Sequence, residues 1–198
     1  MNFNDAGKLL ALFGAAVLAN ACSGSSSNDQ DQAGAAANAA DHYIPAATFQ
    51  DVMDSVVDPA ADYIWEAVSF VSDETGAHEN RPRTDAEWHE LRRRAVILTE
   101  ASNLIGVPGR RVANGDETLE EPAPLAVDEI QLRLDGQHEQ LVGFADAMRS
   151  VALQLVDAAD RKDADAVMDY GSALDEACES CHLVFWYPES AEDYRQDQ

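Results

Sequence analysis

Apolar residues recur with the spacing of an α-helix in four stretches of the chain, and no stretch carries a convincing strand pattern. The first stretch begins near Thr48, whose hydroxyl can cap a helix, and continues to about Val71. A kink or a restart is expected at Asp58-Pro59, because proline lacks a backbone N–H and crowds the preceding turn. One face of this helix carries its apolar side chains: Phe49, Val52, Met53, Val56, Val57, Ile64, Trp65, Val68 and Phe70.

The other three stretches have clear ends. The second opens on the capping box Thr84–Glu87 and stops at Gly106. The third runs over about Val127–Ala159, and the fourth begins after Asp163 and closes before Pro188. Four amphipathic helices with connections of modest length predict an all-α fold, an antiparallel four-helix bundle, in a domain of residues 45–198.

The N-terminal residues have the pattern of an export signal. Lys8 precedes an apolar run, and Ala19-Asn20-Ala21 stands just before Cys22, so residues 1–21 are expected to be a signal peptide. A cysteine in that place resembles a bacterial lipobox, in which Cys22 would carry lipid and become the N-terminus. In the alternative, the protein is soluble in the periplasm and Cys22 has no role. Ser23–Ala40 holds small and polar residues and no large apolar one, so residues 22–44 are expected to be a flexible tether. Both alternatives place the domain in the periplasm, tethered to a membrane through Cys22 in the first.

Charge narrows the range of partners. The 198 residues include 13 basic and 37 acidic side chains, a formal net charge of −24. This balance argues against nucleic acid and anionic lipid as direct partners. The acidic excess is either a solvated surface or a docking surface for basic partner proteins. A membrane contact is therefore expected only through a lipidated Cys22.

The most informative motif is Cys178-Glu179-Ser180-Cys181-His182, the attachment signature of c-type haem. Each thiol can add to one haem vinyl group, and the adjacent imidazole can reach the iron. On a helix these three side chains fall within about 100° of arc, so one face can hold the macrocycle. The alternatives are a zinc site, for which the remaining histidines offer no paired spacing, and a redox CxxC, which normally sits on a βα unit.

With this motif on its last predicted helix, the chain resembles the class II cytochromes c, the cytochrome c′ family, as a lipoprotein-like branch. The segments that carry the resemblance are Phe49–Val68, Arg83–Arg111 and Cys178–Pro188. It implies one covalently attached haem c, with Cys178 and Cys181 as thioether sites and His182 as the proximal iron ligand. Family members often form homodimers, which makes a homodimer possible here. They often carry a basic residue soon after the motif, whereas Leu183–Tyr187 is apolar and aromatic.

The sixth iron position separates two functions. No methionine follows His182, which excludes a class I arrangement. Met53 and Met148 remain, and the resemblance places the distal residue on the first helix, at Met53. A Met53 ligand would give a six-coordinate iron suited to electron transfer with redox partner proteins. If Met53 is core packing instead, the iron is five-coordinate and open to small gases such as NO or CO.

Further residues near the motif have two interpretations each. Phe185, together with Trp186 and Tyr187, is expected either to lie against the macrocycle or to cap the bundle. Arg110 and Arg111 are candidates to pair with haem propionates, or they balance the acidic charge. The sequence shows no nucleophile–base pair, so we expect no enzymatic activity. A third hypothesis is a structural or metal-binding lipoprotein without haem.

Overall fold

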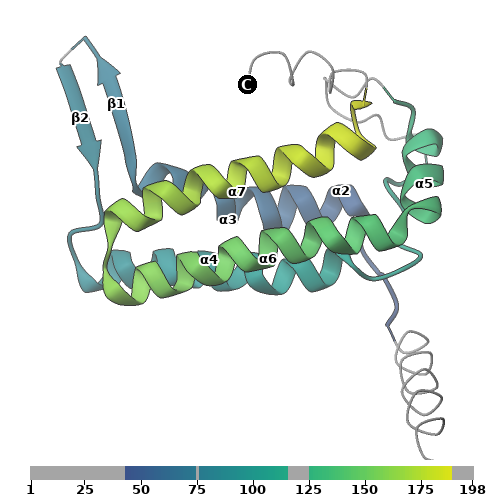
Figure 1. Ribbon diagram of the computed structural model, residues 1–198, viewed down its shortest axis with the longest axis horizontal. Helices are drawn as coiled ribbons and strands as arrows, with labels where there is room; N and C mark the ends of the chain where they lie inside the picture. The colour runs from purple at the N-terminus through teal and green to yellow at the C-terminus, as the bar shows by residue number, and fades with distance from the viewer. Residues whose placement is uncertain (1–42, 75, 116–124, 189–198) are drawn as a thin grey trace, which may run out of the picture. The chain divides into compact units, whose positions relative to one another are not determined.

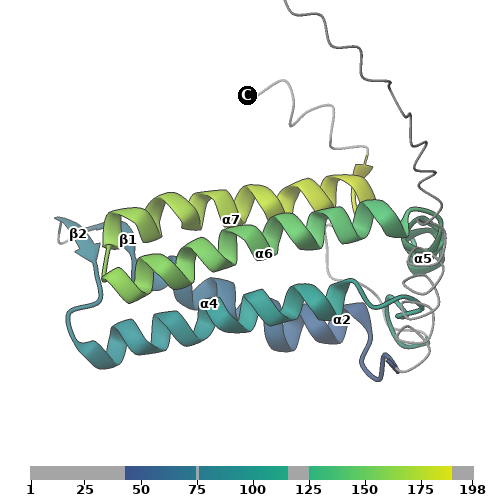
Figure 2. The same cartoon turned by 60° about the horizontal axis from the view of Figure 1, so that its bottom comes forward.

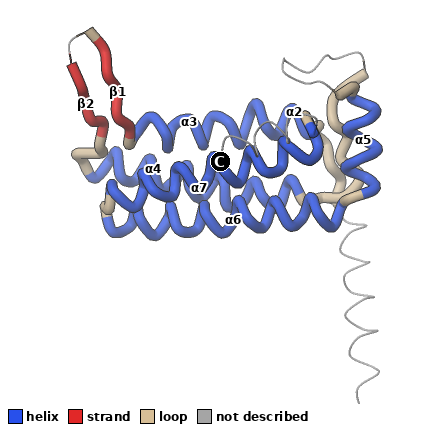
Figure 3. The backbone as a smooth tube through the Cα atoms, turned by 45° about the horizontal axis from the view of Figure 1, so that its top comes forward, coloured by secondary structure: helices blue, strands red, loops and turns tan. Residues whose placement is uncertain are grey.

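The computed structural model describes residues 43–74, 76–115 and 125–188, and these residues are mostly helical. Within this part of the chain, four long helical segments lie side by side and a short helix lies across one end of them (Figures 1 and 3). The first segment consists of α2 (Phe49–Val52), the π-helical turn η1 (Met53–Val57) and α3 (Asp58–Ala67). The others are α4 (Asp85–Ile105), α6 (His138–Arg161) and α7 (Ala164–Phe185), and the short helix is α5 (Val127–Gly136).

Helices α2 and α4 begin at the predicted capping boxes. The Thr48 hydroxyl accepts a hydrogen bond from Asp51 N at 3.0 Å, and the Asp51 carboxylate accepts from Thr48 N at 2.8 Å. Thr84 and Glu87 repeat this exchange at the start of α4, at 3.3 Å and 2.8 Å. Both pairs satisfy backbone donors that have no partner inside the helix, which fixes where each helix starts.

The interruption predicted at Asp58-Pro59 is present and takes the form of a π-helical turn. The backbone N–H of Asp58 donates to Met53 O, five residues earlier, and Pro59 lies in the first turn of α3. The backbone N–H groups of the first turn of a helix have no acceptor within that helix, so a proline there removes no hydrogen bond of α3. Asp58 is therefore the first residue of α3 and not its cap.

A β-hairpin follows α3, and here the prediction of no strands, with a helix to Val71, was wrong. β1 (Ser69–Asp73) pairs antiparallel with β2 (Gly76–Asn80), and the hairpin points away from the helices (Figure 1). Phe70 and Val71 are 72% and 44% exposed, so they do not continue the core face of the helix. Gly76 has φ +126°, a conformation that glycine alone adopts without strain.

The third predicted helix, Val127–Ala159, is in fact two helices, so the single helix was also wrong. Gln137 separates α5 from α6 with ψ 34°, directly after Gly136, which is a poor helix former. The break lets α5 turn and bury Ile130 and Leu134. His138, the first residue of α6, connects this helix to the end of α4, because its Nε2 lies 3.1 Å from Gly106 O.

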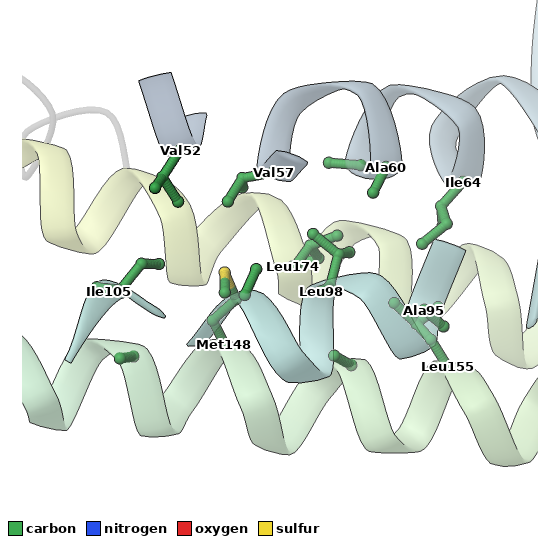
Figure 4. Close-up of a cluster of buried hydrophobic side chains, with 14 of the residues drawn as sticks. Val52, Val57, Ala60, Ile64, Ala95, Leu98, Ile105, Met148, Leu155 and Leu174 are labelled. Carbon is green, nitrogen blue, oxygen red and sulfur yellow. The ribbon is translucent and has the colours of Figure 1, made fainter. Parts of the chain in front are cut away.

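The apolar core lies between the four helical segments. Figure 4 shows side chains from all four meeting there: Val52, Val57, Ala60, Ile64, Ala95, Leu98, Ile105, Met148, Leu155 and Leu174. α6 packs against both α4 and α7 (Figure 2). Met148 is 5% exposed and belongs to this core. In the described residues no helix combines the length and the apolar character that crossing a bilayer requires.

Candidate functional site

The Cys178–His182 motif occupies the last two turns of α7. The helix starts at Asp163, whose carboxylate accepts from Ala166 N at 3.1 Å. Val167 and Leu174 are buried, and they pack α7 against the core. Cys178, Cys181 and His182 are all half-buried, and they fall on one face as their spacing predicts.

The first helical segment runs beside this end of α7 in the opposite direction. Phe49 of α2 contacts Trp186, just after α7, with ring centroids 6.0 Å apart. Farther along, Asp58 at the start of α3 is near enough to Cys178 to interact electrostatically with its thiol. The first segment and α7 are therefore antiparallel.

The π-helical turn Met53–Val57 lies along the first segment between the residues that make these two contacts. Met53 is half-buried and packs against the edge of the core. The structure thus places the first segment beside the motif end of α7, and it keeps Met148 in the core. Single π-helical turns within α-helices occur frequently at functional sites.

Burial controls the protonation of the motif. It raises the pKa of the Cys178 thiol to about 11, with added effect from Asp175, Asp58 and Glu179. It raises the pKa of the Cys181 thiol to about 12, with a smaller effect from Cys178. Both thiols are therefore protonated at neutral pH. Reactive redox cysteines need the opposite environment, electropositive and partly exposed, so this one disfavours a redox CxxC.

His182 is neutral at neutral pH, because burial lowers the pKa of its imidazole while Glu179 opposes that effect. A neutral imidazole has a lone pair free for iron. Two rings lie against it: Trp186 at a centroid distance of 6.2 Å and Tyr187 at 5.9 Å, the latter edge-on. The Tyr187 hydroxyl donates a hydrogen bond to the Glu179 carboxylate at 2.5 Å.

Phe185, Trp186 and Tyr187 therefore separate into two groups. Phe185 is fully buried and packs edge-on against Phe144 at 6.1 Å, inside the core. Trp186 and Tyr187 contact His182.

Glu179 was not among the predicted site residues. Its position three before His182, on the same helical face, was the signal that could have revealed it.

Arg110 and Arg111 have partners within the protein. Arg110 is 7% exposed and donates to the backbone oxygens of Ala47 at 2.6 Å and Leu104 at 3.2 Å. It ties the end of α4 to the residues before α2. Arg111 donates to Asn114 at 3.0 Å. Arg110 thus has a structural role that the sequence alone did not indicate.

The donor set at the motif fits a covalently attached haem. Two protonated thiols can each form a thioether, and a neutral imidazole one residue later can ligate iron from one side. A groove of about 560 Å³ lies between α3 and α7, and its wall includes Trp65 and Asp175, one turn before Cys178. Within residues 43–74, 76–115 and 125–188, no three or more His, Cys, Asp or Glu side chains form a group that could hold a metal ion.

Comparisons with protein-family models, with curated proteins and with solved structures give no match. The function is therefore inferred from the residues and their geometry.

Proposed function

We propose that this protein is a c-type haem protein that transfers electrons in the periplasm. One haem c is bound covalently through Cys178 and Cys181, with His182 as the proximal iron ligand. The observation that carries this proposal is the placement of two thiols and a neutral imidazole together on one half-buried face of α7. When bound, the haem supplies a one-electron couple at its iron.

The helices around the motif support the proposal. We infer that α2–α3, α4, α6 and α7 form the antiparallel four-helix bundle of the class II cytochromes c, with the haem on the last helix. The groove between α3 and α7 has a volume of about 560 Å³, and its α7 wall runs from Val167 to Glu176, so it ends two residues before Cys178.

Met53 is proposed as the distal ligand. It is half-buried on a π-helical turn of the first segment, which runs beside the motif end of α7. A thioether ligand there would complete six-coordination and favour electron transfer over ligand binding.

The second candidate function is binding of NO or CO by a five-coordinate haem. The packing of Met53 against the core edge favours it, because a methionine that serves as packing leaves the sixth position open.

One set of spectra tests both functions. The full chain is produced in a bacterium that attaches haem c, and covalent haem is detected after denaturation. Sharp low-spin bands in the reduced protein, unchanged by CO, would support Met53 ligation. A high-spin spectrum that shifts with CO would support gas binding. The absence of covalent haem would contradict both functions.

The variant Met53→Ala should convert the low-spin spectrum to a CO-sensitive high-spin spectrum. Met168→Ala is the matched control, because Met168 is also half-buried but lies 14 residues before His182 on the same helix. That spacing is about 21 Å along the helix axis, too far for contact with the iron. An unchanged spectrum for Met53→Ala would exclude Met53 as the ligand.

We further propose that residues 1–21 direct export and that Cys22 is lipidated, with residues 22–44 as the tether. Residues 1–42 lie outside the described part of the chain, and Tyr43 and Ile44, at the end of the proposed tether, are exposed. Cys22→Ser should move the protein from the membrane fraction to the soluble periplasmic fraction and leave its haem content unchanged. A Cys22→Ser protein that stays in the membrane fraction would contradict a lipid anchor at this residue.

A further inference from the structure

The end of α7 folds back over its own last turn. The backbone N–H groups of Trp186 and Tyr187 both donate to His182 O, at 2.8 Å and 3.0 Å. Pro188 follows, and a residue before proline is disfavoured in the helical conformation. The helix therefore stops, and the Tyr187 ring lies edge-on to His182 and not on the next helical turn.

From this place Tyr187 reaches Glu179, which lies inside the motif between the two cysteines. Its hydroxyl donates to the Glu179 carboxylate at 2.5 Å, across eight residues of chain. Both side chains are half-buried, which makes the bond worth more than an exposed one. Glu179 also precedes His182 by three residues, the spacing at which helical side chains are neighbours.

Metal-bound histidines usually have a carboxylate or a carbonyl near the ring that orients them and tunes the metal. Glu179 is the carboxylate next to His182, and it opposes the effect of burial on the pKa of the imidazole. A mobile glutamate would let water screen its charge, whereas a bond to Tyr187 restricts it. The motif is followed by the aromatic residues Phe185, Trp186 and Tyr187, and Tyr187 restricts the carboxylate.

We propose that Tyr187 is a positioning residue that fixes the Glu179 carboxylate beside His182, and that this fixed negative charge holds the haem iron in its oxidised state more strongly. The inference rests on the proposed haem function and specifies what tunes the iron there. A nearby negative charge favours ferric over ferrous iron, because the ferric state carries one more positive charge.

The test measures the midpoint potential of the haem-loaded protein by redox titration followed in its absorption spectrum. Glu179→Gln should raise the ratio of reduced to oxidised haem at a fixed ambient potential by about tenfold, which is an upward shift of about 59 mV for a one-electron couple. Tyr187→Phe keeps the ring and the charge but frees the carboxylate, so it should shift the ratio the same way by about threefold. The double variant should match Glu179→Gln alone, since Tyr187 acts through Glu179.

Asp169→Asn is the control. It also removes one negative charge, from an exposed site on α7 that has no side-chain hydrogen bond within the described residues and lies 13 residues before His182, and it should change the ratio less than about twofold. An equal shift in Asp169→Asn, an unshifted Tyr187→Phe, or additive effects in the double variant would each overturn the positioning role. Failure of the unmodified protein to attach haem would instead overturn the proposed function. If Glu179→Gln does not fold, the ratio of reduced to oxidised haem in Tyr187→Phe, compared with that in the control variant, still tests the positioning role.

Discussion

At the scale of single residues, the first turn of α2 links the fold to the site. Asp51 accepts hydrogen bonds from the Thr48 backbone N–H at 2.8 Å and from the Thr48 hydroxyl at 2.7 Å. These bonds, with a smaller effect of Arg111, hold the pKa of the Asp51 carboxyl below its ordinary value of 3.8. The turn they fix carries Phe49, which packs on Trp186 beside the motif.

A pKa that is lower in the folded state than in the unfolded state stabilises the fold only above the unfolded value. The contribution of Asp51 is therefore present above about pH 4 and is lost as the pH falls through its folded pKa.

We expect Asp51→Asn to be less stable than the unmodified protein at neutral pH and to approach it at about pH 3. Urea unfolding at both pH values measures this. Asp169→Asn, an exposed site on α7 with no side-chain hydrogen bond in the described part, is the control. A gap between Asp51→Asn and the unmodified protein that is the same at both pH values would contradict the prediction.

At the scale of elements, α3 and α7 meet at Gly171. The Trp65 indole N–H donates to Gly171 O at 2.9 Å, and a Cβ at residue 171 would lie 3.4 Å from Trp65 Cδ1. The glycine thus admits the indole onto α7, seven residues, or about two turns, before Cys178.

Two glycine substitutions should act in opposite directions. Gly171→Leu should destabilise the protein by about 1–3 kcal/mol, because the longer side chain must displace Trp65. Gly143→Ala should stabilise it by about 0.5–1 kcal/mol, because Gly143 lies inside α6 with nothing near its missing Cβ. Thermal or urea unfolding measures both. Effects of the same sign would show that the contact with Trp65 does not decide the tolerance at residue 171.

The elements that could be predicted are those with a local cause. The starts at Thr48 and Thr84 follow from capping boxes, and the one-face placement of the motif follows from helical spacing. The hairpin could not be predicted, because its strands are exposed and bury no alternating face. The break at Gln137 has a local signal in Gly136, but the direction in which α5 then turns depends on the packing of Ile130 and Leu134, which the local sequence does not contain.

The same distinction holds at the site. Cys178, Cys181 and His182 could be placed from sequence because their chemistry depends on spacing within one helix. The bond from Tyr187 to Glu179 could not, because it requires the chain to turn back at the end of α7. From sequence, Arg110 was a candidate either to pair with propionates or to balance the acidic charge, and the structure gives its guanidinium two backbone acceptors.

At the scale of the whole molecule, repulsion between acidic side chains works against the fold. The net charge is −24, and removal of residues 1–21 would leave it unchanged, since they hold one acidic and one basic residue. The ion pairs in the described part are largely exposed and offset little of this repulsion. The urea midpoint should therefore rise as sodium chloride goes from about 0.01 M to 0.15 M, because the Debye length falls from about 30 Å to about 8 Å. A midpoint that falls over this range would mean that favourable ion pairs outweigh the repulsion.

The same charge should govern encounters with redox partners, but with the opposite dependence on salt. Asp58, Asp175 and Glu179 all interact electrostatically with the Cys178 thiol, so a partner approaching the proposed haem edge there meets negative charge. Attraction steers a basic electron carrier to this surface, and salt screens it. The second-order rate of electron transfer to a basic carrier should fall by about tenfold or more between low salt and about 0.15 M, whereas an acidic carrier should react slowly and speed up. Stopped-flow reduction with one carrier of each sign makes the comparison. A rate with the basic carrier that does not change with salt would mean that the acidic excess is only a solvated surface, remote from the path of the electron.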